Sequence, residues 1–427
     1  MSLRLNFLAN FLGSGAVVLI HLAVTPFYLT YLGAEAFGLI GLFATLTVVS
    51  SVLDLGLSPA ISKELAQLSA NAADQAKIRS TVRSFEVVFC VLAVLLLCLA
   101  YPLLPFLATN WLRIQMLDIQ TVEQALRLMS VQLALQLPLA LYAGSFVGLQ
   151  KQVHFNVLTT VMVFVRMVGA LATMAWGDTS IITFFRWQLL LTACHLAVMG
   201  LFLWRVLPPG RIWFDLAKLK KLSKFASEMA GVAVLSLLLT QLDKIILSRM
   251  LPLSEFGYYM LAWSLASVLL RFATPVFAAW LPRMSQLVQT GDRQALKETY
   301  FSGFKLVAVM VLPVAGIVGI FAHQILEMYT QNLELARVTT PALVMLVIGM
   351  ACNALMHMPY GLTLAHGWAK FALLQNTIAC ICIVPLIYFS VKTLGLQGAA
   401  LGWCVVNVAY VLFSIRFIQR RYFHLQA

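Results

Sequence analysis

Residues 26–59 read PFYLTYLGAEAFGLIGLFATLTVVSSVLDLGLSP. They comprise the end of one apolar segment, a short polar bend from Gly33 to Gly38, and a second apolar segment. The bend is too short to hold a domain, so the two segments are predicted to be antiparallel neighbours. A similar stretch, LPLSEFG, returns at residues 251–257, with Gly257 in the place of Gly38. The offset of 219 residues is close to half of the chain and predicts a tandem duplication.

The composition places the chain among membrane proteins. Of its 427 residues, 61% are hydrophobic and 11% are charged, whereas soluble domains have roughly 25% charged residues. Apolar runs of about 18 residues or more recur from end to end, as in membrane-spanning helices. The runs are continuous rather than alternating, which argues against a transmembrane barrel. We therefore predict an all-α polytopic membrane protein.

About twelve transmembrane helices are predicted, and the connections between them, such as residues 59–82, are too short for a folded extramembrane domain. The spans are roughly 7–30, 36–58, 83–107, 125–149, 154–176, 181–204, 226–249, 256–280, 301–324, 339–362, 369–391 and 396–418. The linker 205–225 contains PPG and a lysine cluster, and it divides the chain into six-helix lobes at residues 1–215 and 216–427. Because both halves begin on the same side of the membrane, we predict two parallel lobes around a central cavity.

The net charge of +13 follows the topology rule for membrane proteins and is no sign of nucleic acid binding. Most Lys and Arg residues fall in the loops on one side, which predicts a cytoplasmic location for those loops and for both termini. The seven cysteines all lie inside apolar runs, so they are predicted to be packing residues rather than disulfides or metal ligands.

Four cations lie within the predicted spans: Arg166, Arg186, Lys244 and Arg271. An ionisable side chain at the centre of a bilayer costs about 2.5–3.5 kcal/mol on insertion scales. Such residues extend to the membrane surface, pair with one another, or face a water-filled cavity. Arg186 lies near the start of its span, so these interpretations remain open for it.

Polar and small residues recur at helical spacing beside the other three cations and on one further span. They are Asn156, Thr159, Arg166, Gly169 and Thr173 on span 154–176; Ser236, Thr240, either Asp243 or Lys244, and Ser248 on span 226–249; Ser264, Ser267, Arg271 and Thr274 on span 256–280; and Gly349, Asn353, His357 and Tyr360 on span 339–362. Stripes of this kind also occur where helices pack together.

Because the stripes come from both halves, we predict that they line a central polar cavity with a cationic character. Its predicted substrate-binding residues are Arg166, Lys244, Arg271, Arg186, Asn156 and Asn353. A cationic cavity favours an anion, and guanidinium groups suit phosphate through paired hydrogen bonds. The predicted substrate is therefore an anion that is too large or too polar to cross lipid unaided.

Two acids, Asp54 and Asp243, also lie within predicted spans. Either they form salt bridges with nearby Arg or Lys residues, or they exchange ions with a gradient. The chain lacks the G-x-x-x-x-G-K-[ST] motif for ATP, and it lacks the H-E-x-x-H and G-x-S-x-G motifs of hydrolases. We therefore predict a protein that is not an enzyme and holds no cofactor or metal. Asp54 and Asp243 are the candidates for coupling to H⁺ or Na⁺, with a salt bridge as the alternative role of each.

Several short stretches resemble a known family. They are residues 6–10, 26–33 (PFYLTYLG), 38–41 (GLIG) and 53–57 (LDLGL) in the first half, and 243–244 (DK), 255–259 (EFGYY) and 282–287 (PRMSQL) in the second. Together with the twelve spans and the basic inner loops, they resemble Wzx-type polysaccharide flippases of the multidrug/oligosaccharidyl-lipid/polysaccharide (MOP) exporter superfamily. The resemblance covers the whole chain.

This resemblance implies a flippase that moves an undecaprenyl-diphosphate-linked oligosaccharide, such as an O-antigen precursor, from the cytoplasmic to the periplasmic leaflet of the bacterial inner membrane. The sugar would cross in the cavity by alternating access, the lipid tail would stay in the bilayer, and a polymerase of the same pathway would be a partner. Arg271 is the first candidate to hold the diphosphate, because an Arg on this helix fits the related lipid-linked precursor flippases. Their basic residue on the first helix is not evident here, since span 7–30 holds only His21.

Other classes fit less well. A cation-coupled drug exporter of the same superfamily usually carries cations, which the predicted cavity would repel. A major-facilitator transporter should have a basic motif after its second helix, and residues 58–64 match it poorly. A membrane glycan polymerase or ligase should have a large outer loop, whereas loops 108–124 and 325–338 are short and carry few charges.

Overall fold

The computed structural model describes residues 3–70, 72–210 and 240–423, together with residues 213, 234 and 237. Every regular element in these ranges is a helix, and they contain no β-strand. The predicted all-α class is confirmed. The chain divides into two compact units between Gln241 and Leu242, which we call lobe 1 and lobe 2. The predicted domain boundary after residue 215 lies outside the described ranges and stays a prediction.

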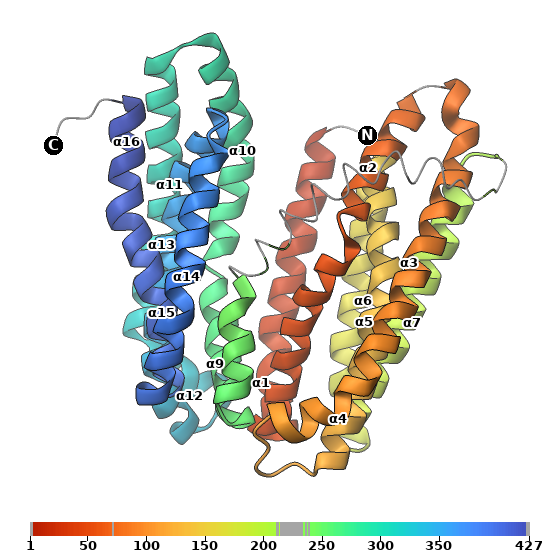
Figure 1. Cartoon of the computed structure of the whole chain (residues 1–427), viewed down its shortest axis with the longest axis vertical. Helices are drawn as coiled ribbons and strands as arrows, with labels where there is room; N and C mark the ends of the chain where they lie inside the picture. The colour runs from red at the N-terminus through yellow and green to blue at the C-terminus, as the bar shows by residue number, and fades with distance from the viewer. Residues whose placement is uncertain are drawn as a thin grey trace. The chain divides into compact units, whose positions relative to one another are not determined.

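Lobe 1 is a bundle of long helices joined by short turns (Figure 1). Its helices are α1 (Leu3–Ser50), α2 (Leu57–Ala70), α3 (Ile78–Ala100), the single turn α4 (Leu104–Phe106), α5 (Ile119–Gly148), α6 (Gln152–Trp176) and α7 (Ile181–Val206). Side chains from α2, α3, α5 and α7 form its apolar core, in which Ile61, Phe85, Leu141 and Leu203 are almost fully buried.

Lobe 2 is a second helical bundle (Figure 1). Residues 242–250 are helical, and they are followed by α9 (Leu253–Ser267), α10 (Leu270–Thr290), α11 (Arg293–Ile320), α12 (Ala322–Thr330), α13 (Leu333–Ala365), α14 (Ala369–Leu394), α15 (Leu396–Ala409) and α16 (Arg416–Phe423). The π-helical turn Tyr410–Ile415 joins α15 to α16. The long helix α13 packs against α9, α10, α11 and α15, so it forms the centre of the lobe.

Most of these helices are long and apolar enough to cross a membrane. Among the described residues, nine segments meet this criterion, and the pair α9 and α10, bent by 43°, makes a tenth. α1 holds two of the predicted spans, because its helix is interrupted at Gly33. The described helices therefore account for every predicted span except 226–249, which lies largely outside the described ranges.

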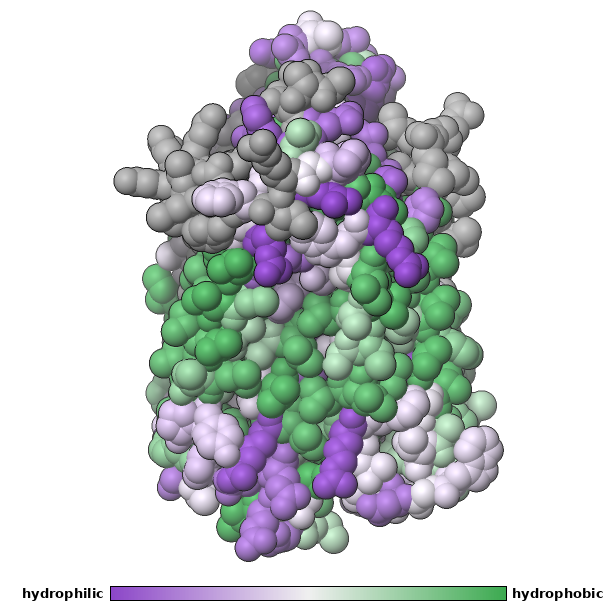
Figure 2. Space-filling model, turned by 90° about the vertical axis from the view of Figure 1, so that its right-hand side faces the viewer, coloured by the Kyte–Doolittle hydropathy of each residue, from purple (hydrophilic) through white to green (hydrophobic). Residues whose placement is uncertain are grey.

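The surface has the polarity of a multi-pass membrane protein. Figure 2 shows an apolar band across one face, with polar side chains gathered toward both ends of it. On α3, Val94 and Leu99 expose 58% and 68% of their surface. Apolar side chains exposed to this extent along a helix indicate a lipid-facing surface.

The first bend interrupts α1 at Gly33, whose φ of 79° lies in the left-handed region that glycine adopts without strain. Figure 1 draws α1 as two rods with a sharp turn between them. The buried carboxylate of Glu35 holds this turn in place. It accepts hydrogen bonds from the backbone N–H groups of Gln115, Met116 and Leu117 at 2.6, 2.7 and 2.8 Å.

The second copy of the bend also lies between two helices. Residues 240–250 are helical, and α9 begins at Leu253. Phe256 is fully buried, as is Phe37 at the same position of the first copy. Both copies therefore join two helices through a buried phenylalanine, as a duplication predicts.

The predicted span 36–58 ends earlier than expected. α1 ends at Ser50, and after one 3-10 turn the backbone is left-handed at Leu55 and Gly56, with φ of 49° and 71°. Two consecutive residues in this conformation cannot continue a helix. The chain therefore changes direction within the predicted span.

The connection 59–82, for which no secondary structure was predicted, is largely helical. α2 has an apolar face that includes Ile61 and Leu65, and this face packs against α5. Its other face carries charged residues, so the stretch lacks the continuous apolar character of a membrane span. A short amphipathic helix of this kind is missed when only long apolar runs are sought.

Candidate functional site

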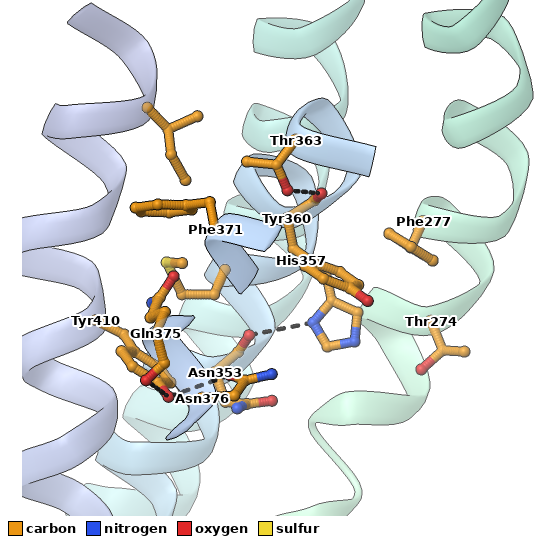
Figure 3. Close-up of a pocket in the computed structure, with 12 residues that line it drawn as sticks. Thr274, Phe277, Asn353, His357, Tyr360, Thr363, Phe371, Gln375, Asn376 and Tyr410 are labelled. Carbon is orange, nitrogen blue, oxygen red and sulfur yellow. Dashed lines mark hydrogen bonds between the residues drawn. The ribbon is translucent and has the colours of Figure 1, made fainter. Parts of the chain in front are cut away.

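Lobe 2 contains a pocket between its helices. Its volume is ≈ 390 Å³, which is within the range of roughly 300–1,000 Å³ for small-molecule sites. Helices α10, α13 and α14 supply most of its wall, and the π-helical turn and α16 complete it. Its lining residues are Thr274, Phe277, Asn353, Met356, His357, Tyr360, Thr363, Phe371, Gln375, Asn376, Tyr410 and Ile418 (Figure 3).

One side of the pocket is aromatic. The rings of Phe277 and Tyr360 are nearly parallel, with their centroids 6.0 Å apart and an angle of 15° between their planes. His357 lies edge-on to Phe277 at 5.8 Å. Figure 3 shows His357 and Tyr360 of α13 beside Phe277 of α10, with Phe371, Gln375 and Tyr410 on the other side of the pocket.

The pocket also carries amide groups that bond to neighbouring helices. Asn353 donates from Nδ2 to Oδ1 of Asn407 at 2.8 Å. Gln375 donates from Nε2 to the hydroxyl of Ser414 at 2.8 Å. These bonds leave the carbonyl oxygen and one N–H of each amide to pair with a ligand.

None of the described lining residues is a Lys, Arg, Asp or Glu. The pocket therefore offers hydrogen-bonding groups and aromatic rings without a formal charge. This combination suits a ligand that is polar, uncharged and partly apolar. It does not suit a small ion, which would need a counter-charge.

The predicted stripe on span 339–362 contributes to this pocket. Asn353, His357 and Tyr360 lie on one face of α13 and line the pocket together. Gln375 and Asn376 were missed, although two adjacent amides inside an apolar span were a visible signal in the sequence.

The structure places Asp243 and Lys244 in contact inside lobe 2. The Lys244 ammonium lies 3.2 Å from Oδ1 of Asp243, and both residues are 2% exposed. Tyr259 donates to Oδ2 of Asp243 at 2.8 Å. The ammonium also lies 3.4 Å from the centre of the Trp263 ring, which stabilises it through a cation–π interaction.

Arg166 lies half-buried on α6 in lobe 1, where Nη1 is 3.5 Å from the hydroxyl of Thr192. Gln132 donates to the same hydroxyl at 3.1 Å, so three helices meet at this polar cluster. His195, one turn further along α7, is 3% exposed, and neither ring nitrogen has a hydrogen-bond partner among the described residues. Sequence reasoning missed Gln132 and Thr192, although Gln188, Thr192 and His195 recur at helical spacing on span 181–204.

The remaining predicted site residues are spread over both lobes. Arg271 is exposed in the first turn of α10, directly after the break that follows α9. Arg186 is exposed on α7, and Asn156 is half-buried in the first turns of α6. Asp54 accepts from the backbone N–H of Ser58 at 2.9 Å, so it holds the start of α2.

Comparison with known proteins identifies the family. A sequence profile described as polysaccharide biosynthesis protein matches residues 3–288, which is more than half of the chain. The chain belongs to this family. The MatE profile also matches, over residues 229–389. The predicted resemblance to the MOP superfamily is confirmed.

Individual relatives agree with this family along the whole chain. A Shigella flexneri protein described by name as a candidate O-antigen transporter is 24% identical over 95% of both chains. The fold is similar to that of a multidrug resistance MATE family transporter in an inward-facing conformation, with a TM-score of 0.76. The two chains are 16% identical, and the match covers 95% of this chain and 94% of the other. It is also similar to the lipid II flippase MurJ, with a TM-score of 0.70 and 14% identity over 97% and 87%. This transporter therefore has the two-lobed MOP fold, and its relatives are transporters or flippases rather than enzymes.

Proposed function

We propose that this transporter is a flippase for a lipid-linked oligosaccharide. Its substrate is a glycan attached to undecaprenyl diphosphate, which it moves from the cytoplasmic to the periplasmic leaflet of the bacterial inner membrane by alternating access. Both termini lie in the cytoplasm, in keeping with the distribution of Lys and Arg residues. A polymerase of the same polysaccharide pathway receives the product.

The observation that carries this proposal is the character of the pocket in lobe 2. A glycan is polar, uncharged in most of its sugars, and apolar on the faces of its rings. Amide groups such as Asn353 and Gln375 suit its hydroxyls, and the rings of Phe277 and Tyr360 suit its faces. The family, and the O-antigen transport for which the Shigella flexneri relative is named, support the same class of substrate.

The second candidate function is export of cationic drugs, and the likeness to a MATE transporter favours it. A cationic ligand needs a carboxylate where it leaves water, and none of the described pocket residues is acidic. Asp243 already pairs with Lys244. We therefore rank drug export below glycan export.

The diphosphate needs positive charge, and Arg271 and Arg166 are the cations that we propose to hold it. Arg271 is exposed, so its guanidinium is accessible to a ligand. We propose that a gradient of H⁺ or Na⁺ drives the cycle, with Asp54 and Asp243 as the residues that couple it. No cofactor is required for this mechanism.

Deletion of the gene in its own host tests the proposal. The expected result is loss of surface polysaccharide together with accumulation of undecaprenyl-diphosphate-linked glycan, and both should be reversed by a plasmid copy. Normal surface polysaccharide in the deletion strain, combined with increased sensitivity to ethidium, would instead assign the chain to drug export.

A further inference from the structure

We propose that the pocket in lobe 2 is a subsite for one uncharged sugar ring and that it discriminates against acidic sugars. This inference rests on the proposed glycan transport. It names the part of the glycan that is recognised, a single sugar ring, and the place where it binds, the pocket in lobe 2. It follows from the polar groups that line the pocket, none of which, among the described lining residues, is charged.

The orientation of Asn353 is fixed by a chain of hydrogen bonds. The carbonyl oxygen of Trp403 can only accept, so Asn407 must present its Nδ2 to it, at 2.8 Å. Oδ1 of Asn407 therefore faces Asn353 and accepts from its Nδ2 at 2.8 Å. As a result, the Oδ1 atom of Asn353 remains as an acceptor for a ligand.

The tautomer of His357 is fixed in the same way. Its Nδ1 lies 3.1 Å from the backbone carbonyl oxygen of Asn353, which can only accept. Nδ1 therefore carries the proton, and Nε2 of the neutral ring is an acceptor. His357 thus presents a second acceptor on the face of α13 that lines the pocket.

The neighbouring amides of α14 add both acceptors and donors. Gln375 donates from Nε2 to Ser414, which leaves Oε1 and the second amide hydrogen. The hydroxyl of Tyr410 lies 3.3 Å from Oδ1 of Asn376 and 3.4 Å from the backbone oxygen of Gln375. The pocket therefore offers neutral acceptors at Asn353, His357 and Gln375, and neutral donors at the amides of Asn353, Gln375 and Asn376.

This set of uncharged groups selects the ligand. A sugar hydroxyl both donates and accepts, so it can pair with either kind of group. A carboxylate only accepts, and none of the described lining residues supplies a counter-charge to it. Uncharged sugars are thus favoured over uronic and sialic acids.

The aromatic side of the pocket supplies the remaining contact. Tyr360 is 41% exposed, and its ring is nearly parallel to that of Phe277. The C–H face of a pyranose ring can pack against such a surface while its hydroxyls point toward the amides. Figure 3 shows Gln375 across the pocket from Phe277 and Tyr360.

Saturation-transfer NMR on the purified full chain in lipid nanodiscs tests the subsite. The probes are free glucose, galactose and N-acetylglucosamine, with glucuronate as the acidic probe. We expect saturation transfer to at least one uncharged sugar and at least about tenfold weaker binding of glucuronate, because its carboxylate would leave water without a counter-charge. Equal or tighter binding of glucuronate would overturn the proposal, as would the absence of binding to every uncharged probe.

Variants locate the binding. Tyr360→Ala and Gln375→Leu should weaken sugar binding about two- to tenfold, while Tyr360→Phe, which keeps the ring, should preserve it. The matched controls are Tyr388→Ala, at a residue that is 42% exposed on α14 outside the pocket, and Gln289→Leu on α10. Unchanged binding in correctly folded Tyr360→Ala and Gln375→Leu would place the sugar elsewhere.

The two proposals fail in different ways. If the deletion strain loses surface polysaccharide but the purified chain binds no sugar at this pocket, the subsite is wrong and glycan transport stands. If the pocket binds uncharged sugars but the deletion strain exports polysaccharide normally, the proposed transport is wrong.

Discussion

Lys244 lies 3.2 Å from the carboxylate of its sequence neighbour Asp243, and both side chains are buried inside lobe 2. Adjacent residues on a helix point about 100° apart, so the long lysine side chain must turn back to reach its neighbour. Tyr259 and Trp263 complete the surroundings of the pair. The cluster thus satisfies both charges within the lobe.

Breaking this pair is expected to destabilise the protein strongly. Asp243→Asn removes the carboxylate that pairs with the buried Lys244 ammonium, and breaking a buried pair costs about 3–5 kcal/mol. The double variant Asp243→Asn with Lys244→Met removes both charges and should recover most of the loss. Thermal unfolding of the detergent-purified variants measures both effects.

The exposed pair of Glu123 and Arg127 on α5 is the matched control. Glu123→Gln breaks an ion pair in contact with solvent, so the melting temperature should stay close to that of the parent. A similar melting temperature for Asp243→Asn and Glu123→Gln would contradict the prediction, because the buried pair of Asp243 and Lys244 would then stabilise the protein no more than the pair on α5.

The membrane spans could be predicted from sequence because each is a long apolar run, and the stripe of Asn353, His357 and Tyr360 could be predicted because it repeats at helical spacing. The other side of the pocket could not. Gln375 and Tyr410 belong to other segments of the chain, and only the packing of α13, α14 and the π-helical turn brings them together.

The cations within the spans show a second limit of prediction from the sequence. The sequence shows that Lys244 lies in a span, but the direction of a long side chain depends on its neighbours in three dimensions. Hydropathy likewise gives no signal for α2, because half of its surface is polar. Long-range contacts decide both features.

Close packing of α5 on α2 should make Gly148 intolerant of substitution. Gly144 and Gly148 form a G-x-x-x-G pattern, and an added Cβ at Gly148 would lie 2.4 Å from the backbone oxygen of Ser62. Gly148→Ala should force the helices apart and cost roughly 1–3 kcal/mol. Thermal unfolding checks this value.

Gly316 on α11 is the control for this experiment. Nothing lies within 4 Å of a Cβ added at Gly316, so Gly316→Ala should be neutral or stabilising by about 0.5–1 kcal/mol, as expected in a helix interior. Equal melting temperatures for the two variants would contradict the close approach of α5 and α2.

Asp54 has a structural contact that can be separated from ion coupling. Its carboxylate accepts from the backbone N–H and the hydroxyl of Ser58 at 2.9 and 3.1 Å. Asparagine caps helices as well as aspartate does, whereas alanine loses about 0.5–2 kcal/mol. Asp54→Asn should therefore keep the melting temperature, and Asp54→Ala should lower it.

The same variants test coupling when polysaccharide export is measured against external pH. Asp54→Asn removes a titrating group without removing the cap, so we expect a flatter pH profile at unchanged stability. An unchanged profile would leave Asp54 with its capping role alone and would exclude it from ion coupling.

Arg271 should contribute to export without contributing to stability. Its side chain is exposed, and it forms no ion pair with any residue that the structure describes. A charge-assisted hydrogen bond to a phosphate is worth roughly 1.5–3 kcal/mol, so Arg271→Ala should weaken precursor binding about ten- to hundredfold at an unchanged melting temperature. The amount of lipid-linked precursor retained in the membrane measures this effect.

Arg337, exposed on the first turns of α13, is the control for a general loss of surface charge. Arg337→Ala should export normally. Lys244→Ala should fail through instability, because it leaves the buried Asp243 without the counter-charge of Lys244.

Arg166→Ala should resemble Arg271→Ala if both cations contact the diphosphate. Normal export by both arginine variants would mean that the diphosphate is held elsewhere, and the cationic site would have to be abandoned.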